Sequence, residues 1–455
     1  MKLAATAEQS TFDELHTAEP FTSASQLSRL DARFQFRERH DLAGLVNWSA
    51  GKSAAFHRWF RYREAYSPDL VEALGLGARI LDPFCGCGSA LIGSMQSGRS
   101  ATGIDLNPLA AFVTKVKIAH LEQGEIELIE AFARNIPQHE KASVEAKLPD
   151  LSIAQKVFEP TILRTVLDLK AQISSVGLSK NARDFLHLAW LGILETVGSY
   201  YKEGNGIKYR KMMRRPGRYV EREHGSWQAK RFGEDQRAFV LTTFRQHLCD
   251  MLEDTRAWKT MPGTAEVVLG NALDLDTLAP GHFDDIVFSP PYANRFDYFE
   301  SMKVELWFGD FVENYGELQT LRKQSLRSHL GADLTRPTVC FDELEDIISR
   351  MDTAASSWRM GVPDLLRGYF SDITHVLQKC RKKIKDGACY VVVGNSAFAG
   401  TIIPSDTLTA IAGRKAGFTN AEIWVTRPLT VAPQQRSVLA GLEPYMRESV
   451  VVLST

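Results

Sequence analysis

A glycine-rich turn between two short apolar runs constrains the fold of this chain more than any other feature. Residues 78–82 and 101–105 each predict a strand, and residues 90–97 predict a helix between them. Gly86 and Gly88 lie in the turn that joins the first strand to the helix. A strand, a helix and a second strand at this spacing form a βαβ unit, which requires a parallel sheet with helices on its faces.

Later parts of the chain alternate between strand-like and helical patterns. Five further runs have strand character, namely residues 266–269, 285–288, 389–393, 421–425 and 449–453. Residues 121–260 lack this pattern and predict helices separated by a basic loop. We therefore expect an α/β fold with seven strands and with helical insertions after the second and the fourth strand.

This pattern divides the chain into a discontinuous domain, two insertions and an extension. Residues 1–50 are polar and mixed, which predicts a loosely packed N-terminal extension. Residues 121–260, with their basic loop, form the first predicted insertion, and residues 311–365 form the second. The predicted α/β domain comprises residues 51–120, 261–310 and 366–455.

The composition excludes several classes of protein. The formal net charge is −1 at pH 7 over 455 residues, so any contact with nucleic acid must come from a local basic patch.

Only Cys85 and Cys87 lie close together among the six cysteines, and no neighbouring Cys or His completes a metal-ligand spacing, so we expect reduced thiols and no metal site. His57 and His329 have no evident partner, and we expect neither to act in catalysis. The sequence has no membrane-spanning stretch or signal peptide, which predicts a soluble, cytoplasmic protein.

Residues 82–88 place a carboxylate and two glycines where the first strand ends. Ligands bind at the carboxyl ends of the strands in open α/β sheets. Asp82 suits a cationic amino group, and Asp105, at the end of the second strand, suits the hydroxyl groups of a ribose. A dinucleotide is the alternative ligand, but Leu91 stands where the GxGxxG motif of dinucleotide sites has its third glycine. An acid in the turn also favours a zwitterionic amino acid over a pyrophosphate, so we favour a methionine-type cofactor.

Four residues directly after the fourth strand are suited to hold a planar base that carries an amino group. Pro290 and Pro291 remove two N–H donors, so the loop presents carbonyl oxygens. Ser289 adds a hydroxyl acceptor, and Tyr292 adds an aromatic face for stacking. Hydrogen bonds from the amino group to these acceptors pull its nitrogen toward tetrahedral geometry, which makes it a better nucleophile toward a sulfonium methyl. A purely structural Pro-Pro turn with a packed tyrosine is the alternative.

The two motifs together resemble the family of DNA amino-methyltransferases. Residues 82–88 are similar to the cofactor loop of that family, Asp105 to its ribose-binding acid, and residues 289–292 to its catalytic tetrapeptide. The resemblance covers the strands and the motif loops, about half of the chain. It implies S-adenosylmethionine as the cofactor and the Rossmann-like fold of class I methyltransferases, a seven-stranded mixed sheet whose last strand is antiparallel.

The resemblance extends to two further segments. Asn271 follows the third strand and is similar to the position that meets the cofactor adenine, where the family usually has an acid. Residues 57–73 look like the segment that closes over the methionine end of the cofactor. The predicted cofactor-binding residues are therefore Tyr62, Ser67, Asp82, Pro83, Phe84, Gly86, Gly88, Asp105 and Asn271, and the predicted catalytic residues are Ser289, Pro290, Pro291 and Tyr292.

The serine before the two prolines suggests which base is the target. Within the family, Ser-Pro-Pro-Tyr is typical of enzymes that methylate N4 of cytosine, whereas N6-adenine enzymes more often have an acid or Asn at the first position. We therefore predict a site-specific N4-cytosine DNA methyltransferase, with an N6-adenine DNA methyltransferase and an RNA base amino-methyltransferase as alternatives. An NAD-dependent dehydrogenase and a catalytically silent DNA-binding protein are the alternatives from other classes. The resemblance also implies a restriction–modification or related defence system, with a cognate restriction or defence component as a partner.

An enzyme that methylates an exocyclic amine must flip the base out of the stack, so we expect duplex DNA as the partner. Residues 208–218 contain six cations and no acid, and glycines at 204, 206 and 217 predict a mobile loop there. A solvated basic loop without a partner is the alternative. A second basic segment follows the catalytic loop. The predicted DNA-binding residues are Lys208, Arg210, Lys211, Arg214, Arg215, Arg218, Arg322 and Arg327.

Overall fold

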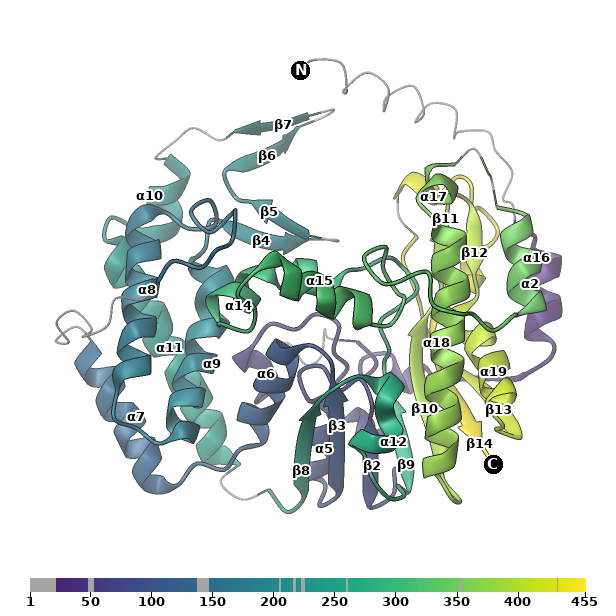
Figure 1. The fold of residues 1–455 in the computed structure, drawn as a ribbon, viewed down its shortest axis with the longest axis horizontal. Helices are drawn as coiled ribbons and strands as arrows, with labels where there is room; N and C mark the ends of the chain where they lie inside the picture. The colour runs from purple at the N-terminus through teal and green to yellow at the C-terminus, as the bar shows by residue number, and fades with distance from the viewer. Residues whose placement is uncertain are drawn as a thin grey trace.

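An eight-stranded sheet forms the centre of the α/β domain (Figure 1). The computed structural model describes residues 22–47, 53–136, 147–203, 206–215, 218–221, 226–258, 261–351, 353, 355–431 and 433–455. In their order across the sheet, the strands are β1 (Gln35–Glu38), β13 (Asn420–Pro428), β14 (Arg447–Ser454), β10 (Ala388–Gly394), β9 (Asp285–Phe288), β2 (Arg79–Asp82), β3 (Ser100–Asp105) and β8 (Thr264–Leu269). Neighbouring strands are parallel except at β14, which is antiparallel to both β10 and β13.

This strand order is that of a class I S-adenosylmethionine-dependent methyltransferase. From the centre of the sheet, β2, β3 and β8 follow one another toward one edge, and β9 and β10 follow toward the other. The loops after β2 and β9 therefore diverge at the carboxyl ends of two neighbouring strands, where open α/β sheets form their ligand crevice. The mixed sheet with an antiparallel last strand, which the family resemblance implies, is confirmed.

The N-terminal region adds a strand that the sequence analysis did not predict. β1 pairs in parallel with β13, so that Phe36 lies beside Ile423. The helix before it, α2 (Ala24–Asp31), buries Leu27 completely. The prediction of a loosely packed extension is therefore wrong for residues 22–47. The reason is that β1 is an edge strand with mostly exposed polar side chains, so its sequence lacks the alternation by which a half-buried strand is recognised.

Helices cover both faces of the sheet. Leu81 and Ile286 pack on the face covered by α18 and α19, whereas Ile80 and Val287 pack on the face covered by α4 and α5. Burial on both faces explains why these strands read as continuous apolar runs. The helices that pack on or beside the sheet are α4 (Leu70–Ala73), α5 (Ser89–Gln96), α6 (Pro108–Ile118), α12 (Leu275–Leu278), α18 (Val362–Lys383) and α19 (Ser405–Lys415).

The first insertion is largely helical and packs against α6, at the opposite end of the molecule from α18 and α19 (Figure 1). Its helices are α7 (Gln123–Asn135), α8 (Pro160–Ser175), α9 (Lys180–Val197), α10 (Ser226–Phe232) and α11 (Gln236–Ala257). The basic run within it is not the loop that we predicted. It lies in two antiparallel hairpins, β4 (Tyr200–Glu203) with β5 (Gly206–Tyr209), and β6 (Met212–Arg215) with β7 (Arg218–Glu221). Of the glycines that suggested a loop, Gly206 is the first residue of β5, and Gly204 and Gly217 lie outside the described residues.

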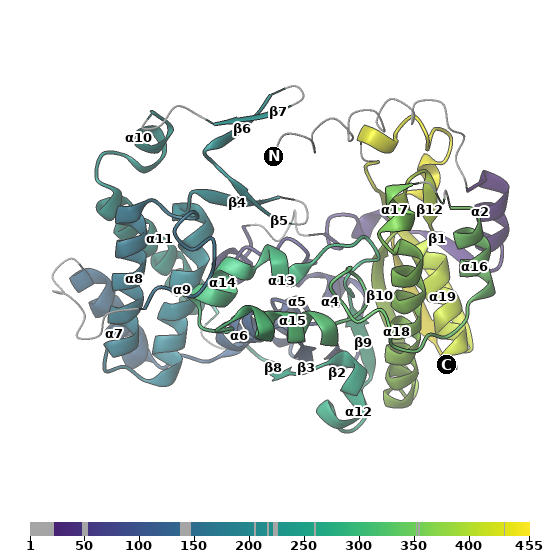
Figure 2. The ribbon, with the colours of Figure 1, turned by 45° about the horizontal axis from the view of Figure 1, so that its top comes forward.

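The chain between β9 and β10 contains the second insertion and α18. Its residues 298–324 lie between the helical insertion and α18: Figure 1 shows α14 and α15 there, and Figure 2 also shows α13. The elements of this segment and of the region after β10 are α13 (Tyr298–Ser301), α14 (Lys303–Phe308), α15 (Tyr315–Gln324), α16 (Asp342–Ser349), α17 (Ser356–Arg359), β11 (Ser396–Phe398) and β12 (Thr401–Ile403). Within the described ranges, no helix has the length and apolar character to span a bilayer. The same residues contain no cluster of side chains suited to bind a metal ion.

Candidate active site

The turn after β2 and the loop after β9 line the same cavity. Its volume is about 870 Å³, and Asp105 at the end of β3 also lines it. A cavity at the carboxyl ends of adjacent strands has the position typical of a small-molecule site in open α/β sheets. The residues predicted from sequence that line it are Tyr62, Pro83, Phe84, Gly86, Asp105, Asn271, Ser289 and Pro291.

Both glycines of the turn adopt backbone conformations that favour glycine. Gly86 has φ +50° and Gly88 has φ +89°. A Cβ atom on Gly86 would lie 3.3 Å from the Tyr62 ring, so the turn and the closing segment are in contact. A Cβ atom on Gly88 would lie 2.9 Å from Cγ2 of Thr114 on α6. Gly88 therefore packs the turn against α6 and does not line the cavity. Gly86 contacts Tyr62 and lines the cavity.

Asp105 combines a structural role with an open position in the cavity wall. Its carboxylate accepts hydrogen bonds from the backbone N–H groups of Gly86 and Asn107, each at 2.8 Å. Burial raises the pKa of Asp105 to about 6, although these two hydrogen bonds favour its ionised form. Each carboxylate oxygen retains a lone pair that can accept a hydroxyl group of a ligand.

Asp82 lies behind the cavity wall. Its carboxylate accepts hydrogen bonds from the Tyr66 hydroxyl at 2.7 Å and from the N–H of Phe84 at 2.9 Å. Asp82 is 1% exposed, and burial raises its pKa to about 7. Tyr66 lines the cavity in its place. Direct contact between Asp82 and a cationic amino group, which the sequence predicted, therefore requires that Tyr66 turn away.

The closing segment contributes Tyr62 as predicted, but it also contributes a carboxylate that the sequence analysis missed. Glu64 lines the cavity, and burial raises its pKa. Ser67 is buried outside the cavity, where its N–H donates to the Leu45 carbonyl and its hydroxyl accepts from the N–H of Asp69. The prediction that Ser67 contacts the cofactor is therefore corrected. Ser67 holds the turn that precedes α4, and residues 64–66 face the cavity instead.

The charges that line the cavity have one sign. Glu64 and Asp105 are its acids, and the described lining residues include no lysine or arginine. His329 also lines the cavity, and burial lowers its pKa, which favours the neutral imidazole. Such a wall attracts a cationic ligand and offers no positive side chain to a pyrophosphate.

The catalytic loop contributes its serine and one of its prolines to the cavity. The Ser289 hydroxyl donates to the Val392 carbonyl at 3.2 Å, which leaves its oxygen lone pairs as acceptors. Pro291 lines the cavity, but Pro290 does not. Tyr292 lies beside the cavity and is partly exposed, and its hydroxyl donates to the Glu448 carboxylate at 2.9 Å.

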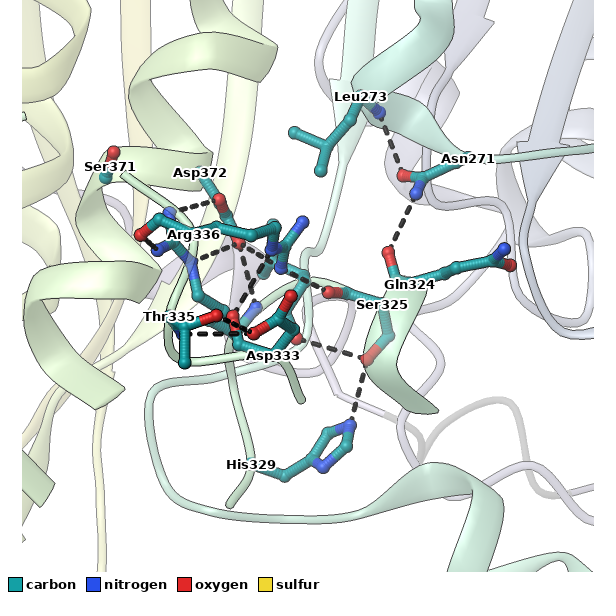
Figure 3. Close-up of polar contacts among 12 residues, drawn as sticks. Asn271, Leu273, Gln324, Ser325, His329, Asp333, Thr335, Arg336, Ser371 and Asp372 are labelled. Carbon is teal, nitrogen blue, oxygen red and sulfur yellow. Dashed lines mark hydrogen bonds and ion pairs between the residues drawn. The ribbon is translucent and has the colours of Figure 1, made fainter. Parts of the chain in front are cut away.

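A loop from the second insertion completes the wall, and no sequence motif identified it. Ser325, Leu326, Ser328 and His329 all line the cavity. Asn271 lies beside this loop: its side-chain amide donates to the Gln324 carbonyl at 2.8 Å, and its oxygen accepts from the N–H of Leu273 (Figure 3). The loop is recognisable only in three dimensions, because it lies more than 30 residues after the catalytic tetrapeptide in the chain.

Arg327 anchors this loop, and its predicted contact with DNA is wrong. Arg327 is 1% exposed, and its guanidinium donates to both carboxylate oxygens of Asp372 on α18, at 2.7 and 3.1 Å. It also donates to the Arg336 carbonyl, and Arg336 itself pairs with Asp372. Figure 3 shows Arg336 and Asp372 at this junction. The sequence displayed a cation near the catalytic loop but gave no sign of its buried partner 45 residues away.

Arg322 and His329 meet at Asp297. The Arg322 guanidinium lies 2.7 Å from the Asp297 carboxylate, and His329 Nδ1 lies 3.3 Å from it. His329 Nε2 is 2.9 Å from the Ser325 hydroxyl. His329 thus has partners that were not evident in the sequence. Arg322 is only partly exposed and is paired with an acid, so its predicted contact with DNA stays a prediction.

The basic hairpins divide their cations between two roles. Lys208 on β5 and Lys211 after it are exposed. Arg210 is instead held against the end of α9, where it donates to the carbonyls of Gly198 and Glu195 at 3.1 Å each, and burial lowers its pKa. Arg210 therefore anchors the hairpins, and because it is partly exposed, its contact with DNA stays a prediction. The side chains of Arg214, Arg215 and Arg218 lie outside the described part of the structure.

Comparisons with known proteins identify two Type II methyltransferases that are similar to this chain. No family model matches the chain. The chain is 25% identical to Type II methyltransferase M.BsoBI from Geobacillus stearothermophilus over 420 residues, which cover 84% of this chain and 82% of that protein. It is 24% identical to Type II methyltransferase M.AvaI from Nostoc sp. over 424 residues, 87% of this chain and 86% of that protein. These similarities support an S-adenosylmethionine-dependent DNA methyltransferase, and together with the fold they imply S-adenosylmethionine as the cofactor.

Among solved structures, the rRNA methyltransferase aviRa from Streptomyces viridochromogenes aligns with 89% of this chain and 92% of that chain. The TM-score is 0.27 and the sequence identity is 10%. A likeness at this level has no bearing on the fold, which the strand order defines by itself.

Proposed function

We propose that this chain transfers a methyl group from S-adenosylmethionine to the exocyclic N4 of cytosine in duplex DNA. One observation carries the proposal: the turn after β2 and Ser289 after β9 line one cavity at the carboxyl ends of neighbouring strands. A methyl donor bound at the turn and an amine held at Ser289 would then meet in the same space. The similarity to two Type II methyltransferases supports DNA as the substrate.

The residues of the cofactor half suit S-adenosylmethionine in charge and in hydrogen-bonding capacity. When bound, the cofactor supplies a methyl group on a cationic sulfonium. Glu64 and Asp105 present carboxylates to this cation, and the two carboxylate lone pairs of Asp105 suit the ribose hydroxyls. The Gly86 backbone lies open to the cavity, so that a ligand can approach the turn closely. We assign cofactor contacts to Tyr62, Pro83, Phe84, Gly86, Asp105 and Asn271, and we add Glu64.

The target half of the cavity supplies acceptors for an amino group. The Ser289 hydroxyl donates to Val392, so its oxygen accepts one amino hydrogen of the base. We assign the other amino hydrogen to the Pro290 carbonyl and the stacking surface to the Tyr292 ring on the basis of the family resemblance, since both residues adjoin the cavity lining without being part of it. These residues orient the nitrogen lone pair toward the cofactor methyl. Positioning of this kind supplies much of the rate, and no strong base is needed before the methyl is transferred. The new N–C bond forms as the S–C bond of the donor breaks to leave a thioether, and the methylated nitrogen then releases one of its two protons to solvent.

Ser289 favours cytosine over adenine, because the serine form of this tetrapeptide is typical of N4-cytosine enzymes in the family that the chain resembles. The deciding experiment uses tritium-labelled S-adenosylmethionine with unmethylated plasmid DNA, followed by nucleoside mass spectrometry. We expect N4-methylcytosine in the digest. Formation of N6-methyladenine would contradict the base assignment alone, and incorporation into RNA but not into duplex DNA would contradict DNA as the substrate.

Two alternatives from other classes remain testable. A dehydrogenase must hold the pyrophosphate of NAD, but the described lining of the cavity offers no lysine or arginine for it. Calorimetry with S-adenosylhomocysteine and with NAD distinguishes the two cofactors directly. A silent DNA-binding protein would retard plasmid DNA in a gel but incorporate no label.

We further propose that the exposed face of the basic hairpins binds the DNA backbone while the target base is flipped. Lys208 and Lys211 are exposed there, and the arginines of β6 and β7 extend the same basic run. The Type II relatives suggest a role in restriction–modification, with a cognate nuclease as a partner of the system. Replacing Lys208 and Lys211 by glutamate should weaken binding to DNA of any sequence and reduce its dependence on salt.

A further inference from the structure

The proposed stacking residue Tyr292 has a support that extends across three strands. Gly394 on β10 is paired with Glu448 on β14, and Glu448 is paired with Arg427 on β13. These three residues therefore form one row across the antiparallel part of the sheet. β10 is also the neighbour of β9, after which the catalytic loop begins.

Two residues of the row, Gly394 and Glu448, contact Tyr292, and the third, Arg427, contacts Glu448. Gly394 leaves space for the Tyr292 ring, since a Cβ atom there would lie 2.8 Å from Tyr292 Cε2. The Tyr292 hydroxyl donates to Oε1 of Glu448 at 2.9 Å, and Oε2 of Glu448 accepts from Arg427 at 2.6 Å. Both carboxylate oxygens of Glu448 are thus engaged, by one partner on either side.

Burial makes this arrangement rigid. The Glu448 side chain is 5% exposed, and its backbone carbonyl accepts the Thr426 hydroxyl. A buried carboxylate with two partners has few alternative rotamers, because losing Arg427 leaves its charge unpaired and losing Tyr292 leaves one buried oxygen without a hydrogen bond. The position of Oε1 is therefore fixed by the sheet, and it fixes the far end of the Tyr292 ring.

Resting on the proposed function, we propose that Glu448 is a positioning residue for methyl transfer. It holds the Tyr292 hydroxyl so that the ring presents a fixed plane to the flipped base, and Arg427 and Gly394 maintain the carboxylate and the space for the ring. Glu448 itself touches neither the base nor the methyl donor. A misplaced base lengthens the path of the methyl group, so the consequence of losing Glu448 is a lower kcat.

A double-variant cycle tests this role. Initial rates of label transfer to unmethylated plasmid DNA are measured for Glu448→Ala, Tyr292→Phe and the combination of both. We expect Glu448→Ala to lower kcat about 10-fold in the wild-type background and less than about 2-fold in the Tyr292→Phe background, because the hydroxyl through which Glu448 acts is then absent. Glu448→Gln keeps an oxygen acceptor and should retain kcat within about 3-fold of wild type.

Controls separate this role from a general loss of structure. Affinity for S-adenosylhomocysteine should stay within about 2-fold of wild type in all these variants, since none touches the cofactor wall. Glu345→Ala removes an ion pair of 2.7 Å with Arg367 outside the cavity and should leave kcat unchanged. Gly394→Ala should lower kcat when residue 292 is Tyr or Phe but not when it is Ala, because only a ring collides with the added methyl.

Two results would overturn the proposal. In the first, the fold-losses of kcat in Glu448→Ala and Tyr292→Phe multiply in the combined variant, which would mean that the two residues act independently. In the second, the loss of kcat follows a loss of folded protein in thermal denaturation. Failure of the proposed function looks different. In that case the wild-type chain itself transfers no label to DNA, or Tyr292→Ala leaves the rate unchanged.

Discussion

The two halves of the cavity are built in different ways. On the cofactor side, Asp105 and Gly86 are separated by 19 residues and are joined by a direct hydrogen bond within one βαβ unit. On the target side, Tyr292 is fixed by Glu448, which lies 156 residues further along the chain. A contact within one βαβ unit therefore holds the turn on the cofactor side, and a long-range contact holds Tyr292 on the target side.

This difference suggests how the two halves respond to change. A contact between neighbours in the chain forms as soon as the local unit folds, whereas a contact over long separations depends on the packing of the whole sheet. We expect damage to the target wall to reduce methyl transfer while cofactor binding persists. We expect damage to the cofactor wall to reduce both.

The largest effect is expected from removing the polar and aromatic groups of the target wall together. Ser289→Ala with Tyr292→Ala should lower kcat for methyl transfer about 1000-fold, because both an acceptor for the amine and the stacking surface are lost. Affinity for S-adenosylhomocysteine, measured by calorimetry, should change by less than about 2-fold. Retained methyl transfer in this variant would contradict the assigned role of residues 289–292.

The next largest effect concerns the anchor of the loop from Ser325 to His329. Arg327→Met leaves Asp372 buried with its main partner removed, so the free energy of unfolding should fall by about 3 kcal/mol in urea denaturation. Arg322→Met removes a partly exposed partner of Asp297 and serves as the control, with an expected loss below about 1 kcal/mol. Equal losses in the two variants would indicate that burial does not distinguish these arginines.

On the cofactor side, the ionisation of Asp105 should set the pH dependence of binding. Burial raises the pKa of this carboxyl to about 6, and a cationic ligand with hydroxyl donors binds the ionised form. Affinity for S-adenosylhomocysteine should therefore be lost as the pH falls through this value, by up to about 10-fold per pH unit.

Two variants check the assignment of this titration. Asp105→Asn should bind more weakly and lose this component of the pH profile, while Asp82→Asn should keep it. A profile that is unchanged in Asp105→Asn would assign the titration to another group, with Asp82 the first candidate, since its pKa is raised to about 7.

The smallest effect tests the carboxylate that the sequence analysis missed. If Glu64 faces the cationic amino group of the cofactor, Glu64→Gln should weaken S-adenosylhomocysteine binding about 5-fold. Binding of 5′-methylthioadenosine, which lacks the amino acid portion, should change by less than about 2-fold. Equal weakening for both ligands would place Glu64 near the nucleoside instead.

The sequence predicted the sheet well because its strands are buried on both faces. All seven predicted strands are present, and the turn at Gly86 and Gly88 lies where the pattern placed it. The edge strand β1 was missed because its exposed side chains carry no apolar pattern. The basic hairpins were taken for a loop because glycine marks hairpin turns as well as loops.

The site was only partly predictable. Residue types at strand ends identified Asp105 and Ser289, because the βαβ arrangement forces the carboxyl ends of parallel strands to one edge. The family resemblance placed Ser67 at the cofactor and a basic segment placed Arg327 on DNA, and the structure assigns both to internal contacts. A cation in a sequence shows its charge but not whether a distant carbonyl or carboxylate satisfies it.

The sequence by itself thus determined the βαβ unit, the turn at residues 82–88 and the placement of the tetrapeptide at a strand end, since these depend on local periodicity and on glycine. Only the tertiary structure decided which side chains face the cavity. Tyr66 covers Asp82, Glu64 faces the cavity, and the segment from Ser325 to His329 closes it. The direction in which a side chain points depends on packing between elements far apart in the chain, and local sequence does not encode it.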